Sequence, residues 1–573
     1  MLVLGLAILP ILIKALFLEA TFRSLMDIDF YGSEEVLQND SIIYFTMLVC
    51  VYSSYLSRGR YLSPLLRTLS AVIWLFYIVD LWVLINFTTR LTVSDVIAYG
   101  AYAPAYLLQA YGLTFLLSLI LALLVAVICY IFVLADYKVA GVGKHSIYLM
   151  LLSLLGLQSF LPNKDSYVNA WAYENFVTHN LKVRSVAKPY STSFINNMSL
   201  KESTVCNMEE PMSKNIILLM VESLSSYQSS LFSGIKDWTP RLDEIARNNQ
   251  YFTNFYANGY TTEAAELALL TGVLPITPPT KDIYDASSPF NGFSQFELSL
   301  PLALRSQGYQ TEFITNSDLA FYQTGEWAKD LGFNYIEGHE NTYYNGFSRY
   351  QFGAAPDKAL YDRILQRISE QSSNYFMFVK TTSSHQPHIN PDTNEKGEEQ
   401  AFRYIDQELG VLYNRLMAMD YFADGVLIIT GDHHVMVPLL QEEIDIYGPH
   451  RASAMVPLVV SYGDRESERK IGSFQHTDIY HGIKKLGTGE SCRSKWIGDL
   501  LDGRFTAEYI AHSQGDDRQL VNVFRGSQTL FVQLDGDNTR LDNPESVEPL
   551  VAEEILRKIN TVRVTRNFQS TMQ

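Results

Sequence analysis

The sequence predicts a protein of two parts. These are an α-helical membrane domain of five spans and an α/β domain with a mostly parallel central sheet. Long apolar runs dominate the chain before about Pro162, whereas the rest has the composition of an ordinary soluble domain. From Lys214 onward, apolar strands alternate with helices, which is typical of a largely parallel α/β sheet. The length of 573 residues also exceeds that of one domain.

Five apolar runs in the first part approach the roughly 20 residues that a bilayer span requires. The first run is not a cleavable signal, because Lys14 interrupts it and no small-residue cleavage site follows. We therefore expect a transmembrane domain over residues 1–162, which either only anchors the chain or presents a lipid to the domain that follows. The runs are Leu2–Ala20, Ser41–Leu56, Leu69–Phe87, Leu113–Leu134 and Ser146–Leu161.

Charged residues between the runs predict the orientation of the membrane domain. Arg58, Arg60 and Arg67 lie between the second and third runs, and Lys138 and Lys144 lie between the fourth and fifth. The loop after the first run is acidic instead. Because basic loops stay in the cytoplasm, the domain after the fifth span is expected outside.

Residues 163–213 are mixed and polar, and we interpret them as a helical connector on the membrane face. Residues 214–573 then form the α/β domain, which ends in a small β-containing subregion after Ser491. The predicted strands are Ile216–Val221, Gln310–Thr315, Tyr375–Lys380, Val426–Ile429 and Val456–Ser461, with helices such as Pro240–Asn248 and Gln400–Met419 between them. The final subregion holds the predicted strands Leu520–Phe524 and Thr529–Leu534 and a helix over Val551–Ile559.

Charge and cysteine content restrict the partners and the compartment. A formal net charge of −17 argues against nucleic acid as a partner. Cys50 and Cys129 lie in apolar runs and act there as small hydrophobic residues. Cys206 and Cys492 lie in the soluble part and are able to pair in an oxidising compartment, but spacing alone does not establish the pairing.

Acidic and histidine side chains follow two of the predicted strands. Glu222 ends the apolar run from Asn215, and Asp432 and His433 end the run from Val426. The carboxyl ends of parallel strands meet at one edge of a sheet, where ligands bind in open α/β folds. Carboxylate oxygen and imidazole nitrogen suit Zn²⁺ or Mn²⁺, so we expect these side chains to share one metal site.

Two adjacent threonines, Thr261 and Thr262, precede a small-residue helical stretch that ends at Thr271 and Gly272. Free N–H groups and the helix dipole at such an N-terminus favour a phosphate or sulfate ester. A hydroxyl there that also contacts the metal becomes a nucleophile at neutral pH. One divalent ion, Mn²⁺ or Zn²⁺ with Mg²⁺ as a further candidate, is therefore expected on four ligands. These are Glu222, Thr262, Asp432 and His433.

Each of these residues alone has an ordinary structural explanation. An acid at a strand end is often a cap or an ion-pair partner, and a threonine pair is often a helix N-cap. His385 follows the strand from Tyr375, and His450 precedes the strand from Val456. Both are either structural histidines or general acid–base and phosphate-oxygen contacts at the same edge. His388 and His434 are weaker candidates.

Further motifs resemble the sulfatase / alkaline-phosphatase superfamily. They are Thr239-Pro-Arg-Leu-Asp-Glu-Ile-Ala246, Phe252-Thr-Asn-Phe-Tyr-Ala257, and Thr262 followed by Leu269-Leu-Thr-Gly272. Thr262 falls where sulfatases carry the cysteine that becomes formylglycine. A threonine at that position, together with the strand-end ligands, is similar to the membrane phospho-transferases. This branch includes lipoteichoic acid synthases, phosphoglycerol transferases and phosphoethanolamine transferases.

The resemblance implies a multi-pass protein of a bacterial inner membrane with its catalytic domain on the periplasmic or extracellular side. It implies that Thr262 is the nucleophile, that Glu222, Asp432 and His433 hold the metal, and that His385 and His450 contact the substrate. The implied reaction moves a phosphorylated head group, phosphoglycerol or phosphoethanolamine, from a phospholipid to a hydroxyl of an envelope glycan or lipid. The alternatives are a membrane-anchored phosphodiesterase, phosphatase or sulfatase-like hydrolase, and a catalytically inactive envelope scaffold.

Overall fold

The structure is a computed structural model, and the chain divides in it into two compact units. One comprises Met1–Ser185 with Met436–Gln441, and the other comprises Val186–Val435 with Glu442–Gln573. The predicted domain boundaries after residues 162 and 213 stay predictions. The described residues are 10–18, 61–87, 90–93, 174–185, 204–276, 293–437, 439–463, 467–513, 520–535, 537–542, 544–565 and isolated positions between them.

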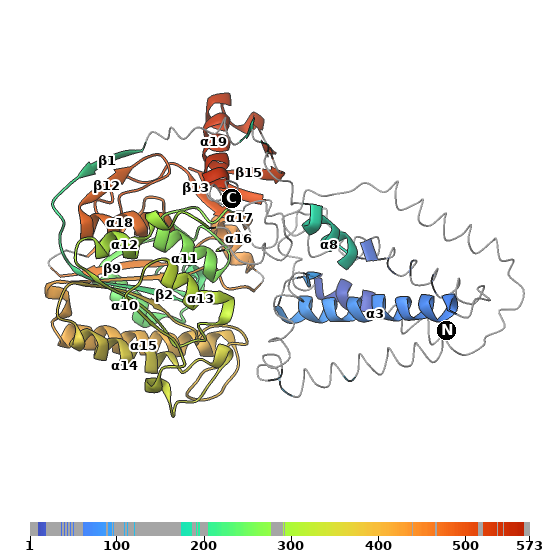
Figure 1. The fold of residues 1–573 in the computed structure, drawn as a ribbon, viewed down its shortest axis with the longest axis horizontal. Helices are drawn as coiled ribbons and strands as arrows, with labels where there is room; N and C mark the ends of the chain where they lie inside the picture. Colours follow the sequence, from blue (N-terminus) through green and yellow to red (C-terminus); the bar gives the residue numbers. More distant parts are fainter. Residues whose placement is uncertain are drawn as a thin grey trace, which may run out of the picture. The chain divides into compact units, whose positions relative to one another are not determined.

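One described helix of the first unit is long and apolar enough to cross a membrane. It is α3 (Leu62–Phe87), whose segment Pro64–Ile85 contains the apolar stretch (Figure 1). This helix includes the predicted third span, Leu69–Phe87. Residues 10–18 are helical and fall within the first predicted span. The remaining predicted spans lie largely outside the described residues, so the five-span topology stays a prediction.

The lysine that interrupts the first apolar run is paired. Lys14 Nζ donates to both carboxylate oxygens of Asp40, at 2.9 and 3.0 Å. The Tyr77 hydroxyl, which lies on α3, donates to the same carboxylate at 2.6 Å. Lys14 therefore does not leave an isolated charge among apolar side chains, which would be costly.

An eight-stranded sheet forms the centre of the second unit, in the order β10-β3-β9-β8-β2-β7-β5-β6. Neighbouring strands run parallel, except that β9 is antiparallel to both β3 and β8. The sheet is therefore mostly parallel, as predicted, and the antiparallel β9 makes it mixed. The strands are β2 (Asn215–Val221), β3 (Gln250–Phe252), β5 (Gln310–Thr315), β6 (Tyr335–Glu337), β7 (Tyr375–Lys380), β8 (Gly425–Gly431), β9 (Leu458–Tyr462) and β10 (Glu468–Lys470).

Five of these strands, β2, β5, β7, β8 and β9, confirm the predicted ones to within two residues at each end. The direction of β9 was not predictable from its residues, because an apolar run indicates a buried strand whichever way the strand runs. The edge strands β6 and β10, and β3 next to β10, have three residues each, which is too few for an apolar period to be recognised.

Helices cover both faces of the sheet, and two hydrophobic cores result (Figure 1). Leu218 and Leu219 are neighbours on β2 but belong to opposite cores, because successive side chains of a strand point to opposite faces. One face carries α10 (Pro240–Arg247), α14 (Asp357–Glu370) and α15 (Glu398–Ala418), and the other carries α11 (Thr262–Thr271), α12 (Leu300–Arg305), α13 (Thr324–Asp330) and α18 (His476–Thr488).

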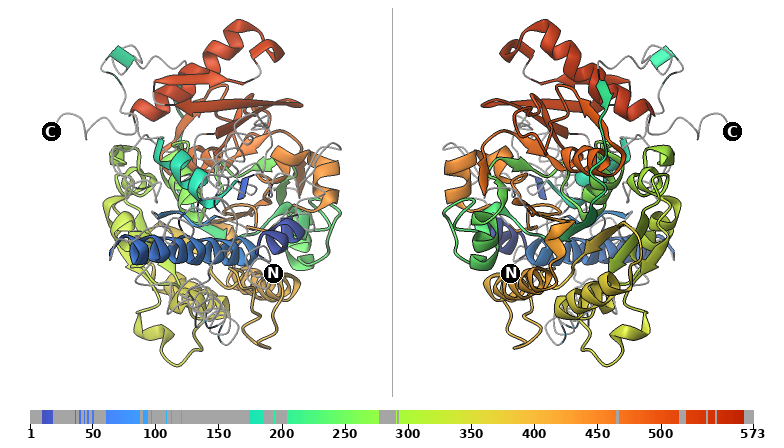
Figure 2. Two further views of the ribbon diagram at one scale, coloured as in Figure 1. Left: turned by 90° about the vertical axis from the view of Figure 1, so that its right-hand side faces the viewer. Right: turned by 90° about the vertical axis from the view of Figure 1, so that its left-hand side faces the viewer.

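A four-stranded antiparallel sheet follows at the end of the chain, with the helix α19 (Pro549–Thr565) packed along it (Figure 2). Ile555 and Ile559 of α19 and Val532 of the sheet join the core beneath α11 and α18. This confirms the predicted C-terminal β-containing subregion. Its strands are β13 (Ile510–Ser513), β14 (Leu520–Arg525), β15 (Gln528–Asp535) and β16 (Asn538–Leu541).

The predicted helical connector is helical only in part. The helix α8 (Phe176–Ser185) agrees with the prediction, but Val205–Met208 forms the strand β1. This strand pairs antiparallel with β12 (Glu490–Arg493). Its backbone groups therefore form hydrogen bonds with the neighbouring strand and not within a helix. Cys206 lies opposite Cys492 and is joined to it by a disulfide.

Removal of this disulfide is expected to destabilise the protein. The bridge closes a loop with a sequence separation of 286, so changing Cys206→Ser together with Cys492→Ser should lower the free energy of unfolding by about 2–5 kcal/mol. Thermal unfolding with and without a reducing agent checks this. The wild-type midpoint should fall on reduction, while the double variant should be insensitive. A wild-type protein that is equally stable when reduced would contradict the prediction.

Candidate active site

The two acidic strand ends lie side by side because β2 and β8 are parallel neighbours. Val221 is in register with Gly431, so the next residues, Glu222 and Asp432, leave adjacent strands at the same level. Both side chains are buried, as is His433. The Glu222 backbone N–H donates at 3.0 Å to the hydroxyl of Thr381, which follows the other parallel neighbour, β7. Three strand ends thus meet at the predicted edge of the sheet.

Thr262 reaches this cluster from the first turn of α11. Its Oγ1 lies 3.3 Å from Glu222 Oε2 and 3.4 Å from His433 Nε2. His433 Nε2 is itself 3.3 Å from Asp432 Oδ2 and 3.8 Å from Glu222 Oε1. The structure therefore brings together all four residues that the sequence predicts as ligands.

The donor set fits one divalent cation. One ligand atom from each of Glu222, Asp432 and His433 lies within 4.8 Å of the others. Asp432 Oδ1 accepts from the N–H groups of Ser223 and His433 at 2.7 and 2.8 Å, while its buried Oδ2 has no hydrogen-bond partner among the residues that the structure describes. His433 Nδ1 lies 2.8 Å from the His434 carbonyl oxygen, which favours a proton on Nδ1 and a lone pair on Nε2.

The two carboxylates have opposite pKa shifts. Burial alone would raise the pKa of Glu222, but the charges of His385 and His433 outweigh it and lower this pKa. Burial and the charge of Glu222 raise the pKa of Asp432 to about 7. Two buried acids this close repel each other when both are ionised, and a divalent cation between them would relieve the repulsion.

The two threonines have different structural roles. Thr261 is the N-cap of α11, with an extended backbone, and its side chain accepts from the Ala264 N–H at 3.3 Å. Thr262 is the first helical residue, and its hydroxyl faces Glu222 and His433 instead. Thr261 therefore has the ordinary structural role of a helix N-cap. The Thr262 hydroxyl does not serve as the cap and belongs to the candidate site.

The two predicted substrate histidines have different surroundings. His385 lies close enough to Glu222 to lower the pKa of that carboxyl, and its ring packs at 4.7 Å on Phe352. His450 packs at 4.6 Å on Phe531 of the C-terminal sheet, and burial lowers its pKa to about 4. Among the described residues we find no hydrogen bond or ion pair from His450 to the four candidate ligands. Its role at the substrate stays a prediction.

The weaker histidine candidates have structural partners. His434 Nε2 lies 2.8 Å from Glu443 Oε1 and its Nδ1 lies 2.7 Å from the Val435 carbonyl oxygen, so both ring nitrogens are engaged. His388 Nδ1 lies 2.9 Å from the Ser384 carbonyl oxygen. The pKa of His388 is lowered to about 4, chiefly by burial, so it is neutral at physiological pH.

One pair near the site was missed in the sequence. Lys380, at the end of β7, donates to Glu266 of α11 at 2.8 Å. Glu266 follows Thr262 by four residues, a spacing that puts two side chains on one helix face. That spacing indicated that Glu266 lies on the same helix face as Thr262. It did not indicate the partner of Glu266, because Lys380 lies 114 residues further along the chain.

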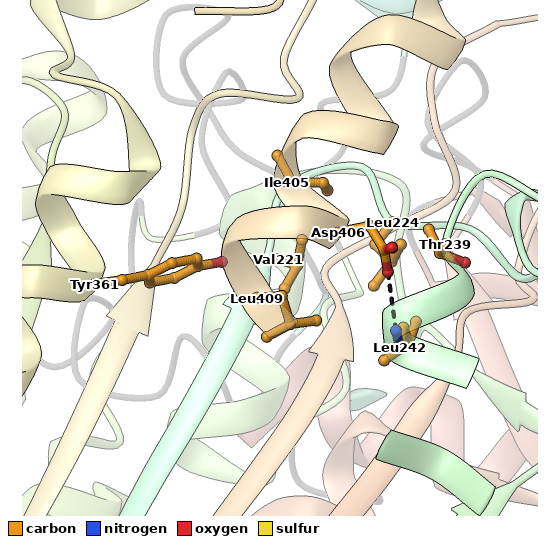
Figure 3. A pocket seen from close by; sticks show the side chains of 8 residues that line it. All are labelled: Val221, Leu224, Thr239, Leu242, Tyr361, Ile405, Asp406 and Leu409. Carbon is orange, nitrogen blue, oxygen red and sulfur yellow. Dashed lines mark hydrogen bonds between the residues drawn. The ribbon is translucent and has the colours of Figure 1, made fainter. Parts of the chain in front are cut away.

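The small cavity shown in Figure 3 is a packing void and not the substrate site. It is lined mainly by aliphatic side chains of α10, α15 and β2, among them Leu242, Leu409 and Val221. Its acidic member, Asp406, accepts from the Leu242 N–H at 2.9 Å. None of the four candidate ligands lines it.

Comparison with known proteins gives the family of this domain. A family model described as sulfatase matches residues 214–489, the range that holds all four candidate ligands. Residues 214–489 form a sulfatase-family domain. A solved structure with a similar fold is that of a protein in the alkaline phosphatase superfamily from Vibrio parahaemolyticus, with a TM-score of 0.51 and 20% identity. The match covers 68% of this chain and 98% of the other, and it shows the fold of the sulfatase-family domain.

Two curated relatives are similar to part of the chain. One is a lipoteichoic acid synthase of Staphylococcus saprophyticus, 22% identical over 241 residues, which are 39% of this chain and 36% of the relative. Another is phosphoglycerol transferase I of Escherichia coli, 23% identical over 242 residues, which are 39% of this chain and 31% of the relative. The chain thus matches about a third of the length of each relative.

Proposed function

We propose that this protein transfers a phosphorylated head group from a membrane phospholipid to a hydroxyl of a cell-envelope glycan or lipid, through phospho-Thr262. The observation that carries the proposal is the Thr262 hydroxyl at a helix N-terminus, 3.3 Å from Glu222 and 3.4 Å from His433. The names of the two curated relatives support phosphoglycerol as the head group. Phosphoethanolamine stays the alternative donor group.

In the proposed first step, Thr262 Oγ1 forms a bond to phosphorus and the bond from phosphorus to the diacylglycerol oxygen breaks. The threonine proton leaves and the diacylglycerol oxygen gains a proton. In the second step the acceptor oxygen forms a bond to phosphorus and the bond from phosphorus to Thr262 Oγ1 breaks. The acceptor hydroxyl loses its proton and Thr262 Oγ1 gains one. The free N–H groups of the first turn of α11 stabilise the charge on the phosphoryl oxygens.

Glu222, Asp432 and His433 would hold the metal ion, with the Thr262 oxygen as the fourth ligand. Mn²⁺ and Zn²⁺ suit this set of carboxylate, imidazole and hydroxyl donors. When bound, the ion supplies positive charge that lowers the pKa of the hydroxyl. Glu222 also accepts from the Thr262 hydroxyl, which orients the oxygen for attack.

A burst assay tests the reaction. The protein is offered a phospholipid with a labelled glycerol backbone and no acceptor, and diacylglycerol release is followed. A transferase should release about one equivalent and then stop. Continued turnover would show that water is the acceptor and that the protein is a hydrolase. Absence of any release would favour the scaffold alternative.

We further propose that the protein resides in the bacterial inner membrane, with the sulfatase-family domain on the outer side. The apolar helix α3 and the Cys206–Cys492 disulfide support this location, because disulfides persist in oxidising compartments.

A reporter fused after Lys214 checks the orientation. An alkaline phosphatase reporter should be active and a green fluorescent protein reporter dark, since the basic loops keep the other side of the membrane domain in the cytoplasm. A fluorescent fusion with an inactive phosphatase fusion would contradict the orientation and with it the access to envelope acceptors.

A further inference from the structure

A buried ion pair lies one helical turn from Thr262. Lys380 Nζ donates to Glu266 Oε1 at 2.8 Å, and the two side chains are 12% and 0% exposed. Glu266 and Thr262 share one face of α11, because four residues separate them. Lys380 is in register with Met220 of β2, so it also lies beside the strand end that carries Glu222. The ammonium group is thus held by a residue one helical turn from Thr262, at the end of a strand beside the one that leads to Glu222.

The lysine has hydrogen-bonding capacity that the described residues do not use. An ammonium group has three N–H donors, and in the described part of the chain Lys380 uses one of them, toward Glu266. Glu266 Oε2 is buried, and none of the described residues hydrogen-bonds to it. Buried polar groups are normally satisfied, so spare donors at the edge of a candidate site indicate a ligand that carries acceptor oxygens.

The charges around Lys380 also point to an anion. The carboxylates of Glu222, Glu263 and Glu266 all act on it. Burial alone would lower the pKa of Lys380, but these carboxylates raise it, so the side chain is charged at neutral pH. A phosphodiester is itself an anion, and its approach to this acidic cluster is unfavourable unless positive charge faces it.

We propose that Lys380 is a substrate-binding residue that donates a hydrogen bond to a non-bridging phosphoryl oxygen of the group transferred to Thr262. Glu266 is then a positioning residue, which holds Nζ toward the first turn of α11. This inference rests on the proposed function for the identity of the anion.

A set of variants separates this role from a purely structural one. Lys380→Met alone would leave Glu266 buried without its partner, so its effect mixes folding with binding. The double variant Lys380→Met with Glu266→Gln removes both charges at similar volume, and its thermal midpoint should stay close to that of the wild type. Lys380→Arg keeps the charge, and Glu266→Gln alone keeps the ammonium.

The measurement is binding of inorganic phosphate to the full-length, Mn²⁺-loaded protein by calorimetry. The double variant should bind phosphate about 10- to 100-fold more weakly than the wild type, the loss expected for one charged hydrogen bond. Glu266→Gln and Lys380→Arg should stay within about 10-fold of the wild type.

Two results would overturn the assignment. One is a double variant that binds phosphate as tightly as the wild type. The other is a Glu266→Gln variant that loses as much phosphate affinity as the double variant. Phosphate binding would then depend on the intact Lys380–Glu266 ion pair and not on the ammonium group itself. Phosphate binding that depends on Lys380 in a protein that releases no diacylglycerol would support this inference while contradicting the proposed function.

Discussion

Thr262→Ala is expected to lower the rate of diacylglycerol release by about 1,000-fold or more, because alanine has no oxygen to accept the phosphoryl group. The hydroxyl lies within 3.4 Å of both Glu222 and His433. The other hydroxyl of α11, on Thr271, donates to the Leu267 carbonyl oxygen at 2.6 Å instead. Trapping with a labelled phospholipid and no acceptor checks the result. The peptide that contains Thr262 should become heavier by one phosphorylated head group.

The neighbouring threonine supplies a matched control. Thr261→Ala removes the N-cap bond to the Ala264 N–H, which should cost about 1 kcal/mol of stability. Since the described residues show no hydrogen bond from that hydroxyl to Glu222 or His433, a measurable fraction of the transfer activity should remain. Retained activity in Thr262→Ala, or an adduct on Thr261, would overturn the assignment of the nucleophile.

The position of the candidate site could be predicted because it depends on strands that the sequence marks clearly. β2 and β8 are continuous apolar runs, as expected for strands covered on both faces, and each ends at an acid. The register that pairs Val221 with Gly431 then puts Glu222 beside Asp432. The resemblance to a known superfamily supplied the position of the nucleophile relative to these ends.

Features that depend on distant packing could not be predicted. The direction of β9 depends on where the chain re-enters the sheet, not on its own residues. His450 precedes that strand as expected, but its ring packs on Phe531, far along the chain, and this contact leaves no signal near either residue. The same holds for Lys380 and Glu266, which belong to separate elements that meet only in the folded domain.

Asp432→Asn is expected to have opposite effects on the metal-free and the metal-loaded protein. In the metal-free protein, Asp432 Oδ2 is buried, lacks a hydrogen-bond partner in the described part of the chain and lies near the ionised Glu222. Asparagine keeps the oxygen that accepts from Ser223 and His433 and replaces the other oxygen by a donor. The chelator-treated variant should therefore be more stable than the wild type by about 1–3 kcal/mol.

The pH dependence of this gain has a definite sign. The pKa of Asp432 in the folded protein is raised to about 7, chiefly by burial and next by Glu222, above the value of an unfolded chain. A raised carboxyl pKa means that the folded state binds the proton more tightly, so stability falls as pH rises toward about 7. The neutral asparagine does not titrate, and its advantage should be larger at pH 8 than at pH 5.

Addition of metal should reverse the order of stability. A ligand at about 1,000 times its Kd stabilises the folded state by about 4 kcal/mol, which the wild type should gain with Mn²⁺ or Zn²⁺. The asparagine variant lacks an anionic ligand, so metal should stabilise it far less. Elemental analysis of the variant should show a low metal content. Thermal unfolding of both proteins with chelator and with metal measures the four stabilities. A variant that gains as much from metal as the wild type would show that Asp432 is not a ligand, because loss of an anionic ligand must weaken the binding of a cation.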